Sequence, residues 1–456
     1  MHEFVHGFAQ YLTKNECLVV EAGEEKELRK DIDSHRKVRY LSLLPRPDSQ
    51  FSFSFCEAKY VRDLHVLKKW HQIGTILPQL LGKFTSLRAL NLGESGIQEL
   101  PREVGNLIHL RLLNLKKNNI KRLPETVQNL HYLQTLDLEF CDMLEELPNG
   151  MGKLINLRYL QFELVHCSKI FPKGIGGLSS LRTLTEFLVI NDDGACNLCD
   201  LGDLNNLQGH LSIRWRAEVA ADVKGAEKAK LKNKIHLKGL TLDFEGMKEE
   251  GAAGVIEALQ PHLKLESLEI QDYRGRVFPS WLERLSKLRH LVIFRCPNFG
   301  HLPKLGNLPF LETLAMYYMP CLKKLGQEDF IGEGITIPLP SALASSSSLS
   351  GTAIIRVSFP KLKRFSLSEM EEWEEWEMMI TDENEDDGIV RRIMPFLQAL
   401  TILNCPKLTA LPNHLLRQAP LEELHIEGCT LLRQRYSSQD GEDWHLVSHV
   451  PIISVD

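Results

Sequence analysis

The sequence predicts an α/β repeat solenoid, because of its length and two patterns that recur in register. The chain has 456 residues, more than a single closed core normally accommodates. The pattern Leu-x-x-Leu-x-Leu returns at intervals of 23, 23 and 24 residues, starting at Leu87, Leu110, Leu133 and Leu157. A Leu-Pro pair marks the second half of the units at Leu100, Leu123, Leu147, Leu302 and Leu411. About fourteen or fifteen units, several of them degenerate, fit the 20–29-residue leucine-rich class.

The physics of one unit explains the architecture. In the stretch x-Leu-x-Leu-x, apolar residues alternate with period two, which is typical of a short strand with one buried face. One such strand cannot bury that face alone, but stacked copies form a parallel sheet and a continuous core. We therefore expect a leucine-rich-repeat horseshoe with a concave parallel β-sheet and an irregular or 3-10 convex side.

A structural position follows each strand. Three residues after the last apolar position of the strand, the chain has to turn inward. A small polar or thiol side chain fits there and can bond to the backbone of the turn. The residues predicted at this turn slot are Asn118, Cys141, Cys296, Cys405 and Cys429.

The repeats are not uniform along the chain. Residues 185–236 contain no clean repeat, and residues 326–358 hold Gly, Pro and a serine run typical of a loop. Residues 369–387 hold eleven Asp or Glu and no Lys or Arg. The predicted order is regular repeats 36–184, irregular insertion 185–236, repeats 237–325, flexible loop 326–358, C-terminal repeats 359–435 with an acidic loop 369–388, and tail 436–456.

Bulk properties narrow the function classes. The formal net charge of −6 does not favour a nucleic-acid partner for the chain as a whole. No apolar run approaches the roughly 18 residues that a membrane span needs. The ten cysteines form no disulfide framework, so we expect free thiols and a reducing, cytoplasmic location.

Motifs of catalysis are weak. His2-Glu3-Phe4-Val5-His6 matches the zinc-protease pattern H-E-x-x-H, yet the glycine and third histidine of its longer form are absent. Cys196 and Cys199 form a lone C-x-x-C without a second pair at zinc spacing. The sequence contains no P-loop and no G-x-S-x-G. We therefore predict that the chain is not an enzyme and has no metal site; a zinc protease is the disfavoured alternative.

The outward positions of successive strands form the predicted binding surface. They carry a mixture of charged, amide and aromatic side chains, as protein-binding surfaces do. The concave-face residues predicted to contact a protein ligand are Asn91, Asn114, Lys116, Asp137, Glu139, Tyr159, Gln161, Tyr317, Arg364, Glu423, His425 and Glu427.

Several segments together resemble one family. The first nine residues, MHEFVHGFA, resemble the M-H-D-L-V-H-D-L-A stretch that closes the nucleotide-binding region of plant intracellular nucleotide-binding leucine-rich-repeat disease-resistance proteins. Segments similar to that family's coiled-coil subgroup are 38–43 (VRYLSL), 278–282 (FPSWL), 371–376 (EEWEEW) and 441–451. The resemblance covers essentially the whole chain.

The resemblance implies a recognition and autoinhibitory region of an immune receptor, which binds a pathogen effector or a guarded host protein. Residues 1–35 then correspond to the end of the nucleotide-binding module, a short helical remnant of its winged helix, and His2 matches the histidine that contacts ADP phosphate. Glu3 departs from the family's Asp, and the P-loop is missing. We therefore expect no cofactor here, with ADP or ATP bound only in a full-length receptor that contains the intramolecular nucleotide-binding module. The alternative is a free-standing scaffold or decoy that regulates full-length receptors.

Overall fold

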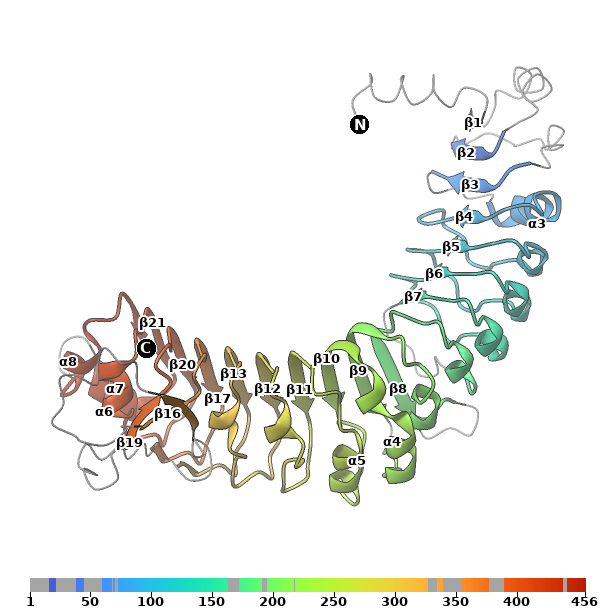
Figure 1. Ribbon diagram of the computed structural model, residues 1–456. Coiled ribbons are helices and arrows are strands. Elements are labelled where there is room, and N and C mark those ends of the chain that lie inside the picture. Colours follow the sequence, from blue (N-terminus) through green and yellow to red (C-terminus); the bar gives the residue numbers. More distant parts are fainter. Residues whose placement is uncertain are drawn as a thin grey trace. The chain divides into compact units, whose positions relative to one another are not determined.

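The computed structural model describes residues 16–21, 38–44, 60–67, 69, 73–162, 172–190, 195–216, 218–326, 334–338, 354–376, 389–437 and 441–456. The chain divides into two compact units, Met1–Gly209 and His210–Asp456. In each unit, short strands stack along one face and short helices lie on the opposite face (Figure 1). The prediction of a leucine-rich-repeat solenoid is confirmed.

The sheet of the first unit is parallel and follows the sequence order. Its strands are β1 (Cys17–Glu21), β2 (Tyr40–Leu44), β3 (Asp63–Val66), β4 (Ala89–Asn91), β5 (Leu112–Asn114), β6 (Thr135–Asp137) and β7 (Tyr159–Gln161). The register pairs Leu90 with Leu113 and Leu113 with Leu136, and all three side chains are fully buried. The leucine periodicity of the sequence is therefore the stacking register of the core. β8 (Glu186–Ile190) follows later in this unit.

The opposite face of this unit is built from short helices. They are α3 (Ile73–Lys83) and the 3-10 helices η1 (Arg102–Asn106), η2 (Glu125–Asn129), η3 (Asn149–Lys153), η4 (Ile175–Gly177) and η5 (Leu198–Leu201). Pro101, Pro124 and Pro148 stand at the N-caps of η1, η2 and η3 in extended backbone. Each Leu-Pro pair thus buries its leucine and starts a helical turn with its proline, since proline lacks the N–H that a helix start leaves unused.

The second unit repeats this plan with longer strands. They lie in the order β9 (Gln208–Arg216), β10 (His236–Asp243), β11 (Ser267–Gln271), β12 (His290–Phe294), β13 (Thr313–Tyr317), β17 (Arg364–Ser368), β20 (Ala399–Leu403), β21 (Glu423–Glu427) and β22 (Ile452–Val455). The opposite face carries α4 (Val223–Ala229), η6 (Leu231–Asn233), α5 (Ala252–Ala258), η7 (Leu282–Arg284), η8 (Leu305–Asn307), α6 (Asn413–Gln418), α7 (Thr430–Tyr436) and α8 (Trp444–Val447). From β10 to β22 every neighbouring pair is parallel.

The structure differs from the predicted insertion at 185–236. β8, η5, β9, α4 and η6 all fall within this range, and Leu198, Leu201, Leu204, Leu207 and Leu211 are buried. The repeats therefore continue through it. Its lysines stand on the surface of α4 and η6, except Lys234, whose side chain is buried.

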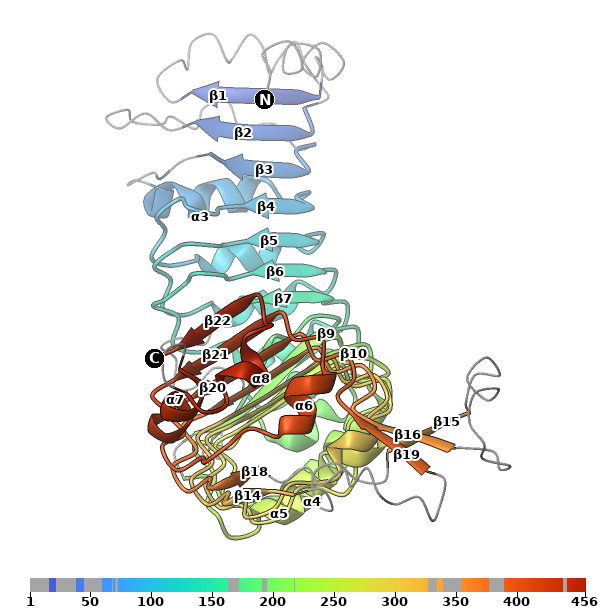
Figure 2. The same ribbon diagram turned by 90° about the vertical axis from the view of Figure 1, so that its left-hand side faces the viewer.

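Two further predicted loops contain ordered strands. β14 (Lys324–Leu325) pairs with β18 (Glu375–Trp376), so the described part of the acidic loop, 369–376, belongs to a repeat. Trp373 and Trp376 are buried, with ring centroids 5.4 Å apart. β15 (Ile335–Pro338), β16 (Ile354–Ser358) and β19 (Ile389–Ile393) form a small sheet at the side of the second unit (Figure 2).

The start of the chain is described only in part. His2 and the rest of the predicted winged-helix remnant lie outside the described residues, apart from 16–21. There the chain forms β1, which pairs in parallel with β2, so this stretch belongs to the repeat sheet and not to a helical remnant. Within the described ranges, no helix has the length and apolar character that crossing a membrane requires.

Candidate recognition surface

The turn slot is a ladder of hydrogen bonds between successive repeats. The side-chain oxygen of Asn118 accepts from the backbone N–H of Gly96 (2.9 Å) and of Ile97 (3.1 Å). Its amide nitrogen donates to the carbonyls of Leu92 (2.8 Å) and Leu115 (2.7 Å). One buried side chain thereby pairs four backbone groups of two repeats, groups that would be costly to bury alone.

The four predicted slot cysteines occupy the equivalent position. Cys141, Cys296, Cys405 and Cys429 are all buried free thiols. Cys141 donates to the carbonyl of Leu115 (3.2 Å), and the backbone N–H of Cys405 donates to Sγ of Cys429 (3.3 Å). Burial raises the pKa of Cys296 to about 12, so this thiol is a packing group and not a nucleophile.

The other chemical motifs do not assemble into sites. Cys196 is buried, and burial raises the pKa of its thiol, whereas Cys199 is partly exposed in η5. In the part of the chain that the structure describes, no three His, Cys, Asp or Glu residues are grouped so as to hold a metal ion. The H-E-x-x-H segment lies outside the described residues.

In the first unit, the central row of the sheet face bonds to its own backbone. The side-chain oxygens of Asn91, Asn114 and Asp137 each accept from the backbone N–H two residues later, at 2.9–3.0 Å. Asn91 also bonds to His65 on the neighbouring strand. Three of the predicted contact residues are therefore already partly satisfied within the chain.

The neighbouring row contains an ion pair. Lys116 pairs with Glu139, and its ammonium group lies 5.1 Å from the centroid of the Phe140 ring. Tyr159 is exposed and Gln161 is half-buried at the end of the sheet. In this unit the predicted surface is thus a set of polar side chains, several of which bond to their own backbone or to one another.

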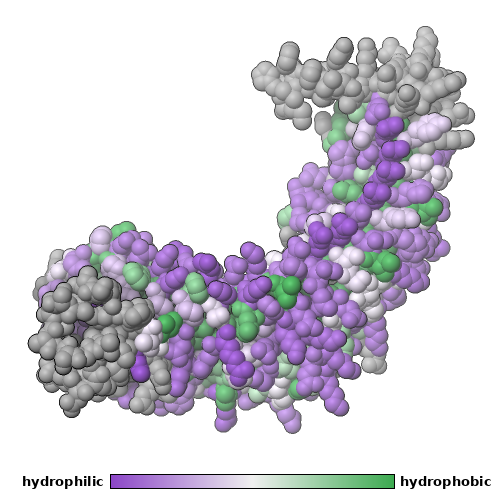
Figure 3. Space-filling model, in the orientation of Figure 1, coloured by the Kyte–Doolittle hydropathy of each residue, from purple (hydrophilic) through white to green (hydrophobic). Residues whose placement is uncertain are grey.

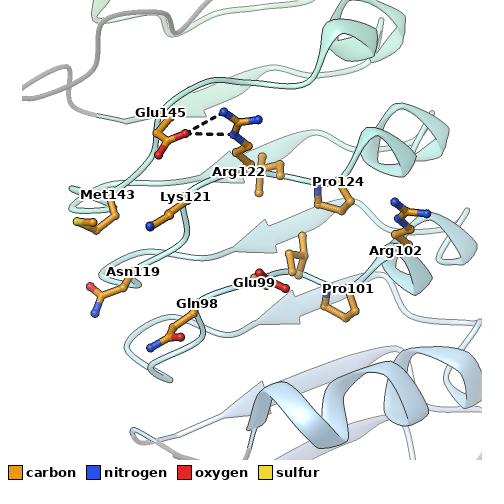
Figure 4. Close-up of a pocket in the computed structure, with 12 residues that line it drawn as sticks. Gln98, Glu99, Pro101, Arg102, Asn119, Lys121, Arg122, Pro124, Met143 and Glu145 are labelled. Atoms are coloured by element: carbon orange, nitrogen blue, oxygen red, sulfur yellow. Dashed lines mark hydrogen bonds and ion pairs between the residues drawn. The ribbon is translucent and has the colours of Figure 1, made fainter.

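Two hollows open on the first unit. One, of about 280 Å³, lies on the sheet face and is lined by Tyr40, His65, Asn91 and Leu112, among others. The other, of about 860 Å³, lies at the flank, lined by the loops of three successive repeats (Figure 4). There Arg122 bonds to Glu145 at 3.1 Å (Figure 4).

In the second unit the sheet face has an aromatic centre. The rings of Phe294 and Tyr317 meet edge to face on adjacent strands, with centroids 6.4 Å apart, and both are partly exposed. Arg295 lies over the Phe294 ring at 5.1 Å and pairs with Asp272 at 2.8 Å. Figure 3 shows hydrophobic residues scattered over a mainly hydrophilic surface in this unit, so an exposed aromatic pair on the strand face stands out.

Four further predicted contact residues lie on other strands of the same face. Arg364, Glu423 and Glu427 are exposed and His425 is half-buried. Arg364 begins β17, and the other three project from β21, in register with it through β20. Among the described residues none of the four has an ion-pair partner, so their charges are available to a ligand.

A polar network that the sequence did not indicate lies at the other end of this face. His210 bonds to Thr241 (3.0 Å), and Thr241 donates to Glu269 (3.2 Å), which also accepts from Gln271 (2.7 Å). Burial lowers the pKa of His210, against the opposing effect of Glu269. The sequence did not predict the strand β9, which positions His210, because the leucine pattern is weak there.

A second missed set follows the strands. A residue with positive φ follows the strand, three residues after its end in β4 to β6 and directly after its end in the second unit. The values are 51–59° at Glu94, Lys117, Phe140, Asp272, Arg295, Tyr318, Glu369 and Asn404. This left-handed row forms the rim of the sheet face. Glu94 and Lys117 pair across it at 2.7 Å. Because none of these residues is glycine, no composition signal revealed the turn.

The fold and its repeat chemistry define a class of protein. The repeats match a family model described as a leucine-rich repeat region over residues 60–415. A leucine-rich-repeat protein of Leptospira interrogans shares the fold, with a TM-score of 0.52 at 22% identity over 96% of this chain and 99% of that one. The chain belongs to the leucine-rich-repeat family and, within it, to the plant leucine-rich-repeat disease-resistance proteins.

Three curated relatives show the similarity to plant disease-resistance proteins. Disease resistance protein RGA2 of Solanum bulbocastanum is 34% identical over 343 residues, which are 73% of this chain and 32% of the relative. Putative disease resistance protein RGA4 of the same species is 35% identical over 344 residues, which are 73% of this chain and 31% of the relative. Putative disease resistance RPP13-like protein 1 of Arabidopsis thaliana is 30% identical over 265 residues, which are 54% of this chain and 22% of the relative. The chain spans about a fifth to a third of the length of these relatives.

Proposed function

We propose that this chain is the recognition and autoinhibitory region of a plant intracellular immune receptor, and that it binds a pathogen effector or a guarded host protein in the cytoplasm. The observation that carries the proposal is the sheet face of the second unit. There Phe294 and Tyr317 are partly exposed, and β17 and β21 of the same face carry Arg364, Glu423 and Glu427, which have no ion-pair partner among the described residues. Aromatic anchors surrounded by polar groups are the usual centre of a protein interface.

The first unit's sheet face is the weaker candidate for the contact. Its central row bonds to its own backbone, and Lys116 is paired with Glu139. A partner would have to replace these bonds, and replacing a satisfied group yields little net free energy. The proposal therefore concentrates recognition on β12, β13, β17 and β21.

Autoinhibition places a thermodynamic requirement on the ligand. A ligand that binds the restrained and released receptor equally well shifts nothing. The partner must therefore prefer the released state, in which the sheet face is no longer engaged with the nucleotide-binding module. Because the P-loop is missing from this sequence, we expect this chain alone to bind neither ADP nor ATP tightly. Tight binding in calorimetry would contradict that expectation.

The test is co-purification from challenged plant tissue with a full-length receptor that carries these repeats. The double variant F294A/Y317A should lose the captured protein. A matched control, Tyr132→Ala with Ile155→Ala, removes two exposed apolar side chains from the first unit's flank and should retain it. Capture that survives F294A/Y317A, and exchange of Arg364, Glu423 and Glu427 as well, would contradict the assignment of the surface.

A further inference from the structure

A second surface lies on the flank of the second unit, away from the outward side chains of the sheet. It consists of Lys264, Lys287, Phe310, Lys361 and Phe396. Each stands three residues before a strand, and the starts of these strands, β11, β12, β13, β17 and β20, are paired in register. The five side chains therefore occupy one position in five successive repeats and form a row, named here the basic ridge.

The centre of the basic ridge is a ring between two ammonium groups. Nζ of Lys287 lies 4.5 Å from the centroid of Phe310, and Nζ of Lys361 lies 4.1 Å from it. Lys287 comes from the preceding repeat and Lys361 from the following one, so the ring lies between them. The negative faces of the ring hold both cations in place.

The row beside the basic ridge shows the contrast. Two residues further along, Glu312 pairs with Arg289 (2.5 Å) and with Lys363 (3.5 Å). In the neighbouring repeats Lys238 pairs with Glu266 (3.5 Å). The adjacent row is thus neutralised by its own ion pairs. The lysines of the basic ridge, by comparison, have no carboxylate partner among the residues that the structure describes.

The chemistry of the ridge selects its partner. Unpaired ammonium groups in a line attract a line of negative charge, and complementarity of this kind guides association. Single-stranded nucleic acid stacks successive bases on open aromatic faces, but the two lysines lie over the Phe310 ring, which leaves Phe396 as the one exposed ring of the ridge. Carboxylate groups bind to ammonium groups without an aromatic surface. We propose that the basic ridge is a docking site for an acidic segment of a protein partner, distinct from the recognition surface on the strand face.

The experiment uses the whole chain and fluorescence anisotropy. The probe is a labelled peptide of about ten glutamates, compared with a peptide of the same number of glutamines and with an oligothymidine of equal length. The five ridge positions span about 19 Å at the ~4.8 Å repeat spacing, so an extended peptide of this length more than covers them. The glutamate peptide should bind at low salt and dissociate as the ionic strength rises, because exposed charges are screened. The glutamine peptide should not bind.

Variants then locate the binding. The double variant K287Q/K361Q should weaken binding of the glutamate peptide about tenfold, since each exposed ion pair contributes a few-fold. K287R/K361R keeps both charges and should restore it. The matched control K224Q/K228Q removes the same charge from exposed lysines of α4 and should change binding less than about twofold.

Three outcomes would overturn the proposal. The first is that the wild-type chain does not bind the glutamate peptide. The second is that K224Q/K228Q weakens binding as much as K287Q/K361Q, which would indicate a general charge effect. The third is that oligothymidine binds more tightly than the glutamate peptide, which would assign the ridge to nucleic acid. All variants are at exposed positions, and matching thermal melting curves confirm that each is folded.

Discussion

The side-chain oxygen of Asn118 accepts a hydrogen bond from the backbone N–H of Ile97, 3.1 Å away in the preceding repeat. Asn118→Ala removes this bond and the four other side-chain hydrogen bonds of Asn118, leaving backbone groups without partners. We expect the free energy of unfolding to fall by about 2–4 kcal/mol, measured by urea denaturation. Asn119→Ala, at the exposed neighbouring position, should change it by less than about 0.5 kcal/mol. Equal effects would refute the ladder's role.

Trp373 tests whether the acidic segment belongs to the repeats. Its side chain is 0% exposed, and its ring nitrogen donates to the carbonyl of Glu375 at 3.0 Å. Trp373→Ala should destabilise the second unit by about 3–5 kcal/mol, the usual cost of removing a buried tryptophan. Glu371→Ala, two residues away and exposed, should have little effect. If the thermal transition were unmoved in Trp373→Ala, the segment would be a loop.

Gly428 directly follows β21, at the position equivalent to the left-handed row, and has φ of 66°. A methyl group there would collide with the side-chain oxygen of Asn404 and would keep a strained backbone. Gly428→Ala should therefore destabilise the chain by about 1–2 kcal/mol. Gly300 has open space around its Cα, so Gly300→Ala serves as control and should be nearly neutral. Chemical denaturation of both variants distinguishes the two sites.

His210 links stability to pH. Burial lowers its pKa below the ordinary 6.5, so the unfolded chain binds a proton that the folded chain resists. The contribution of His210 to the free energy of unfolding is fully present above that ordinary pKa. It is lost as the pH falls through the lowered pKa of the folded state. His210→Gln should reduce the loss of unfolding free energy between about pH 7 and pH 5. His109→Gln, at a site outside the hydrogen-bonded network of His210, should leave the slope unchanged; an unchanged slope in both would contradict the linkage.

The cysteines should separate by reactivity. Cys17 and Cys321 are exposed free thiols, whereas Cys296 is buried and its pKa is raised to about 12. Because the thiolate is the reactive form, iodoacetamide should label Cys321 in the folded protein and Cys296 only after unfolding. Peptide mass spectrometry reads both sites in one sample. Labelling of Cys296 at the rate of Cys321 would show that the turn slot opens in the folded state.

The regular repeats could be predicted because one residue type at one spacing determines them. Leu87 to Leu157 gave the register of β4 to β7 directly, and the turn slot followed from the same count. The prediction failed at β9, where polar His210, Ser212 and Arg214 interrupt the pattern on a strand that is nonetheless buried along Leu211 and Ile213. Periodicity detects a strand only when leucines mark it.

Amino-acid composition gave a wrong prediction for the acidic segment and no prediction for the left-handed row. Eleven carboxylates suggested a loop, although the two tryptophans among them are core residues. Besides Asp272 and Asn404, the left-handed row carries Glu, Lys, Arg, Phe and Tyr, whose identities do not favour positive φ. Pairing between repeats, such as Lys287 and Lys361 on Phe310, depends on side-chain positions that spacing alone does not provide.

The self-bonded row of the first unit has a consequence for association. Asn91, Asn114 and Asp137 are each held by the backbone N–H two residues later, so each side chain is restricted to one rotamer before any partner arrives. Immobilising a flexible side chain on binding costs about 0.5–1.5 kcal/mol, and these three have already lost that freedom on folding. This row is therefore preorganised. Each of its contacts with a partner would contribute little free energy, but together they would select a partner by the shape of its surface.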